Sequence, residues 1–139
     1  MKKVNKLLFG ILGLFVIFIV GCVTTTETPK YLEFSENSNP IIRTGENYNL
    51  RFFVINPTQN TFTGELEYQY DNRCIWTSGS DEVEITPKEY REAIVKSFSN
   101  SGRSNDETCF QTPIKITTIL KDKGGEPKGK FDVLLTIVR

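Results

Sequence analysis

Apolar and polar residues alternate along much of the chain after residue 30, and this alternation predicts β-strands. The clearest case is Thr61 to Tyr70, where Phe62, Leu66 and Tyr68 would face inward and the carboxylates outward. Alternation or short apolar runs predict further strands at Tyr31–Phe34, Pro40–Ile42, Tyr48–Asn56, Cys74–Trp76, Val83–Ile85, Ile114–Leu120 and Phe131–Val138. The pattern therefore predicts a mainly β domain.

Residues 86–98 fit two interpretations. Thr86 to Glu89 match a helix capping box with Pro87 at the first helical position, and apolar residues follow at helical spacing. Ala93 to Phe98 would equally serve as a strand. We expect a short helix near 87–94 that runs into a strand.

About seven short strands separated by turn residues are typical of a single two-sheet sandwich. The long strand that ends in Asn56-Pro57-Thr58 resembles a feature of the immunoglobulin-like domains of prokaryotic surface proteins. The resemblance implies an antiparallel immunoglobulin-like β-sandwich over residues 31–139. It does not extend to the Cys…Trp…Cys order of antibody domains, because Trp76 follows Cys74 by two positions.

The first twenty residues have the layout of an export signal. Lys2, Lys3 and Lys6 precede Leu7 to Val20, a run of fourteen residues without a charged or polar side chain. As a helix this run would span about 21 Å, against about 30 Å for the hydrocarbon core of a bilayer. Its length favours a cleaved signal peptide over a permanent transmembrane helix.

The end of this run, Ile19-Val20-Gly21-Cys22, resembles the lipobox of prokaryotic lipoproteins. The resemblance implies cleavage between Gly21 and Cys22 and a diacylglyceryl lipid, with acyl chains such as palmitate, on the Cys22 thiol. Two acyl chains suffice for stable anchoring. We therefore expect a signal peptide at 1–21, a threonine-rich tether at 22–30 and a domain at 31–139, held on the cell membrane and facing the periplasm or the exterior. An uncleaved anchor and plain secretion are the alternatives.

With Cys22 assigned to the lipid, Cys74 and Cys109 remain as an even pair. An exported protein with two remaining cysteines is expected to form one disulfide. If the sandwich has the immunoglobulin-like arrangement, Thr61–Tyr70 and Ile114–Leu120 are adjacent antiparallel strands. Cys74 then lies just after the end of the first strand and Cys109 just before the start of the second, and these two ends lie close together.

Charge and composition exclude several classes of function. The chain has 17 basic and 17 acidic residues; removing the three lysines of the signal leaves 14 against 17, a net charge of −3. This balance offers no basic stripe for nucleic acid. The chain contains no histidine, which removes His-dependent nucleophilic sites and nearly every catalytic zinc site. We therefore expect a protein that is not an enzyme and has no cofactor or metal.

Three aliphatic residues lie out of phase with the predicted core of the last two strands: Ile119, Leu134 and Val138. If the strands pair, these side chains would form an apolar patch that could contact an envelope protein or a glycan. Our leading hypothesis is a membrane-anchored, non-catalytic lipoprotein that displays a small binding or structural module. The alternative is an exported inhibitor or an accessory subunit of an envelope complex.

Overall fold

The computed structural model describes residues 29–87, 91–100 and 107–139. These ranges contain eight strands and one short helix. The strands are β1 (Leu32–Phe34), β2 (Ile41–Arg43), β3 (Asn47–Ile55), β4 (Phe62–Gln69), β5 (Asp81–Ile85), β6 (Arg91–Ser99), β7 (Ile114–Asp122) and β8 (Pro127–Val138), and the helix is α2 (Thr108–Gln111). The predicted mainly β domain is confirmed. No helix in the described ranges is long and apolar enough to cross a membrane.

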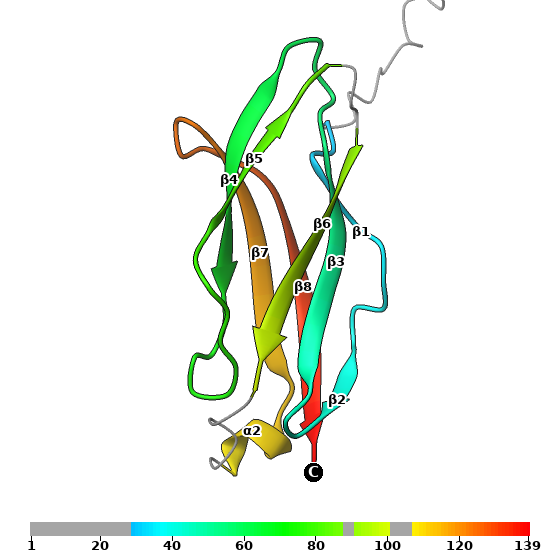
Figure 1. Ribbon diagram of the computed structural model, residues 1–139, viewed down its shortest axis with the longest axis vertical. Coiled ribbons are helices and arrows are strands. Elements are labelled where there is room, and N and C mark those ends of the chain that lie inside the picture. The colour runs from blue at the N-terminus through cyan, green and yellow to red at the C-terminus, as the bar shows by residue number, and fades with distance from the viewer. Residues whose placement is uncertain (1–28, 88–90, 101–106) are drawn as a thin grey trace, which may run out of the picture.

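The strands form two sheets that face each other (Figure 1). One sheet has the order β1-β3-β6 and the other has the order β2-β8-β7-β4-β5. All neighbouring strands are antiparallel except β2 and β8, which are parallel. The first two strands therefore belong to different sheets, although only a short segment separates them.

The core lies between the sheets and is formed by the alternate residues of each strand. In β3 the side chains at positions 48, 50, 52 and 54 are buried, and in β8 those at 133, 135 and 137 are buried. Since successive side chains of a strand point to opposite faces, one set from each strand enters the core.

The close approach of β4 and β7 requires the glycine at position 64, an inward-facing position of β4. A Cβ atom at this residue would lie 2.5 Å from the carbonyl oxygen of Lys121, and the ring of Phe62 approaches almost as closely. A side chain would therefore push β4 away from β7. Only glycine lets the two backbones approach this closely.

The structure corrects the short helix predicted near 87–94. Residues 91–94 belong to β6, while 88–90 lie outside the described residues. Arg91 to Ser99 pair with β3 residue by residue along their whole length. This pairing outweighs the local helical signal, because most of the stability of a short element comes from tertiary contacts.

Two further differences concern the ends of the sandwich. Cys74 to Trp76 do not continue β4 as a strand; a turn holds Cys74 and Ile75, and Trp76 makes an isolated bridge to Ser99. The helix α2 was not predicted. It is a single turn whose buried residue is Cys109.

Candidate functional site

A disulfide joins the end of β4 to α2, as the cysteine count predicted. Cys74 and Cys109 are bonded, with their Cα atoms 5.5 Å apart. Both residues are buried in the core. The predicted disulfide is confirmed.

Residues 74–79, which we call the strap, lead from this disulfide toward β5 in the same sheet and contact β6 of the other sheet. Trp76 N donates to Ser99 O and Ser99 N donates to Trp76 O, each at 2.9 Å. Thr77 Oγ1 donates to Ser97 O at 2.6 Å. The strap therefore lies beside the last third of β6 and covers that part of the strand's outer edge.

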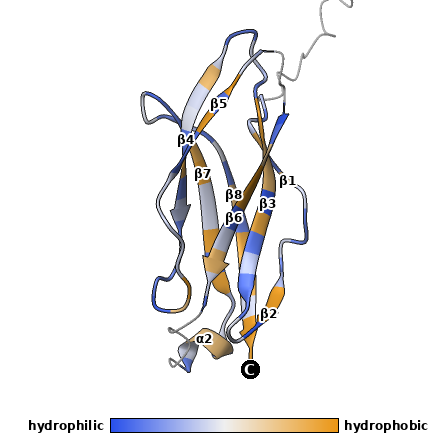
Figure 2. Cartoon of the chain, in the orientation of Figure 1, coloured by the Kyte–Doolittle hydropathy of each residue, from blue (hydrophilic) through white to orange (hydrophobic). Residues whose placement is uncertain are grey.

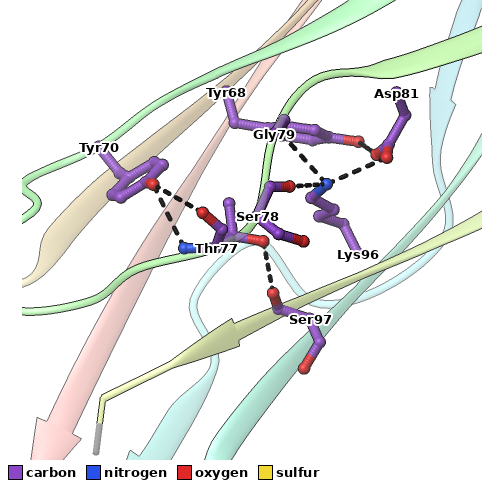
Figure 3. Close-up of polar contacts among 8 residues, drawn as sticks. All are labelled: Tyr68, Tyr70, Thr77, Ser78, Gly79, Asp81, Lys96 and Ser97. Atoms are coloured by element: carbon purple, nitrogen blue, oxygen red, sulfur yellow. Dashed lines mark hydrogen bonds and ion pairs between the residues drawn. The ribbon is translucent and has the colours of Figure 1, made fainter. Parts of the chain in front are cut away.

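Lys96 fixes the far end of the strap (Figure 3). Its side chain points inward from β6 and is only 8% exposed. The ammonium donates to the carbonyl oxygens of Ser78 and Gly79 at 2.6 and 3.3 Å and to Asp81 Oδ1 at 3.0 Å. These three acceptors match the three protons of the group, so the buried charge is fully hydrogen-bonded.

Tyr68 completes this cluster from β4. Its ring lies 4.9 Å from the Lys96 ammonium, and its hydroxyl donates to Asp81 Oδ2 at 2.7 Å. Burial raises the pKa of Tyr68 well above its usual range, and the hydrogen bond and negative charge of Asp81 add to the shift. The phenol therefore stays protonated and acts as a donor. The cluster joins β4, β5 and β6 and fits a structural role that holds the two sheets together.

Substituting Lys96 should separate the contribution of its charge from that of its stem. Lys96→Met keeps the aliphatic packing over Tyr68 but removes the donor to Ser78, Gly79 and Asp81. Because these three residues are exposed or partly exposed and can bind water instead, we expect a loss of about 1 kcal/mol or less. Lys96→Ala also leaves a cavity and should cost about 2–3 kcal/mol. Urea denaturation of both variants measures the difference. Equal losses would show that the ammonium bonds, and not the stem, hold the strap.

The structure separates the three residues of the predicted apolar patch. Leu134 and Val138 are exposed on the outer face of β8, at 42% and 38%. Ile119 is half-buried on β7 and pairs with Lys130, whereas Leu134 pairs with Lys115. Polar residues occupy the positions between them, so Ile119 does not adjoin the other two.

Ile41 takes the place of Ile119 beside Leu134 and Val138. It pairs with Thr136, the residue midway between those two, and is 69% exposed. Figure 2 shows the apolar colouring of β2 and of the end of β8 at this corner. The sequence carried a signal for Ile41, because in an edge strand only one of two adjacent isoleucines can face the core.

The predicted signal-cleavage and lipidation residues, Gly21 and Cys22, lie outside the described residues. Within the described ranges, no three or more His, Cys, Asp or Glu side chains are grouped in a way that could hold a metal ion. The structure thus shows three features that the sequence analysis did not predict: the strap, the Lys96 cluster and the apolar corner at Ile41.

Comparison with known proteins finds similarity only among solved structures. No family model matches the chain. No curated protein sequence matches it. Among solved structures, the chain is similar to a FixG-related protein from Vibrio parahaemolyticus, with 19% sequence identity and a TM-score of 0.45 over 64% of this chain and 74% of that chain.

Proposed function

We propose that the protein is a lipid-anchored lipoprotein that displays a small, non-catalytic β-sandwich outside the cytoplasm as a binding or structural module. The observation that carries this proposal is Ile19-Val20-Gly21-Cys22 at the end of an apolar run with a basic start. The thiol of Cys22 is the acceptor of the lipid, and two acyl chains hold the chain on the membrane.

The disulfide supports a location outside the cytoplasm. Buried bridges such as Cys74–Cys109 form and persist in oxidising compartments and are rare in reducing ones. The position of β1 is also consistent with a tether, because nine residues separate Cys22 from Leu32, the first strand residue.

We further propose that the sandwich is immunoglobulin-like. The start of the chain is split between the two sheets: β1 pairs with β3, and β2 pairs in parallel with β8. Such a split first strand, with three strands in one sheet and five in the other, is compatible with that architecture. An outer face that combines Ile41, Leu134 and Val138 is a candidate surface for a partner.

Replacing Cys22 tests the anchor directly. Cells that express Cys22→Ser should incorporate no labelled palmitate into the protein, and the precursor should keep residues 1–21, because the acceptor thiol is gone. Gel fluorography and intact mass spectrometry measure the two results. Cys109→Ser is the matched control and should retain the label, since that thiol belongs to the disulfide. Labelling that survives in Cys22→Ser would refute the proposal.

A further inference from the structure

Four strands lie at sheet edges, and β6 differs from the other three. β1 and β2 have three residues each. β5 has five residues, of which Asp81, Glu82 and Glu84 carry negative charges. Short or charged edges resist the addition of a further strand. β6 has nine residues and is the longest edge of the sandwich.

The backbone of β6 is open over its first half. Ser99 directs both its N–H and its C=O away from β3 toward Trp76, and Ser97 directs its C=O to Thr77. Because the direction alternates along an antiparallel strand, Val95 and Ala93 also direct their N–H and C=O groups away from β3. The hydrogen bonds from the strap to the backbone of β6 end at Ser97. In the part of the chain that the structure describes, no backbone hydrogen bond reaches Val95 or Ala93 from the side away from β3.

The side chains of Ala93, Ile94 and Val95, in the middle of this open edge, are apolar, whereas Arg91 and Glu92 at its start are charged. Val95 is 60% exposed on the outer face, and Ala93 is exposed next to it. On the inner face, Ile94 is partly buried against the core. An inward charge such as Lys96 often protects an edge, but here Asp81 neutralises it at the strap end. Glu92 is on the same face at the start of the strand, so the part of the edge without a charged side chain is Ala93 to Val95.

The strap already pairs with part of this edge as a further strand would. Trp76 and Ser99 form a complete antiparallel bridge, so the edge accepts an extended backbone where the strap reaches it. We propose that an extended segment of a partner protein adds to β6 beside Ala93 and Val95 as a further strand. Main-chain hydrogen bonds would supply the affinity, and alternating apolar side chains over Ile94 and Val95 would supply the specificity.

The anchor argues against a second copy as the occupant, and this step rests on the proposed lipoprotein function. The chain enters the domain at the Arg91 end of β6, because Ile55 pairs with Arg91 and donates its N–H to Tyr31 O. Two identical strands paired antiparallel are related by a two-fold axis perpendicular to the sheet. Their Arg91 ends, and with them their two lipid anchors, would point in opposite directions. A segment of a different protein meets no such conflict.

A display selection tests the edge with the full-length protein in detergent micelles. The probe is a library of displayed random peptides, and peptides that alternate apolar and polar residues should be enriched. Val95→Pro should weaken their binding at least about tenfold, because it removes an outward N–H while every bond to β3 remains. Ala93→Pro is a second variant of the same kind, should the first fail to fold. Glu65→Lys, at an exposed residue of β4 in the other sheet and away from Ile41, Leu134 and Val138, should bind like the wild type.

Amide hydrogen exchange of the bound wild type should show slowed exchange at Ala93 and Val95. Enriched peptides that bind both proline variants normally, or that protect β2 or β5 instead, would overturn the inference, as would a selection that enriches nothing. These outcomes are independent of lipid labelling at Cys22. A protein that binds peptides at β6 without carrying a lipid would refute the anchor and leave the edge standing.

Discussion

Removing both sulfur atoms of the Cys74–Cys109 bridge should lower the free energy of unfolding by about 4 kcal/mol. The residues are separated by 35 positions, and in the chain-entropy model a loop of that size, once freed, adds this much to the stability of the unfolded state. A domain of this length has a total stability of only about 5–15 kcal/mol. Urea denaturation of Cys74→Ala/Cys109→Ala measures the loss, and the melting temperature should fall by roughly 15 °C.

Reduction of the wild type provides the matched control. Dithiothreitol should destabilise the wild-type protein by a similar amount and leave the double alanine variant unchanged, since the variant has no bridge to reduce. Single variants are less informative because each leaves a free, reactive thiol. A loss below about 1 kcal/mol in the double variant would contradict the argument and would mean that the strap and α2 hold their places without the bond.

The strands could be predicted because a strand that is buried on one face imposes a period of two on the sequence. Thr61–Tyr70 shows this period without interruption and Phe131–Val138 shows it except at Leu134 and Val138. The structure places both in the five-stranded sheet. The pairing of Cys74 with Cys109 was predictable for a different reason: assigning Cys22 to the lipid left only two cysteines.

The strap could not be predicted, because its contacts depend on residues that are distant in sequence. In the sequence, Lys96 is a polar residue in a segment that fits a helix and a strand equally well. Only the pairing of β6 with β3 directs its side chain toward Asp81. Trp76 has no periodic neighbours, and its position depends on Ser99. The same limit applies to the neighbours of Ile41, since its place beside Leu134 and Val138 follows from the parallel pairing of β2 with β8.

The strap and the Lys96 cluster are both connected to one core side chain, Phe98, through Tyr70 and Tyr68. It lies two residues after Lys96 on the same inner face of β6 and is completely buried. The rings of Tyr68 and Tyr70 meet it edge-on at 5.8 and 5.4 Å. The Tyr68 hydroxyl donates to Asp81 of β5, and the Tyr70 hydroxyl accepts from Thr77 N of the strap. Packing in the core therefore positions the polar contacts that cover the edge of β6.

Phe98→Ala should accordingly cost about 3–5 kcal/mol, because it leaves a cavity among the rings of Tyr48, Tyr68 and Tyr70. Phe98→Leu is the matched control and should cost less than about 1.5 kcal/mol, since it keeps most of the volume. Urea denaturation measures both losses. In Phe98→Ala, amide exchange at Ser99 should also accelerate more than at Val133, because Tyr70 loses the ring that positions it against Thr77. Equal losses for the alanine and leucine variants, or unchanged exchange at Ser99, would show that the strap is held independently of the core.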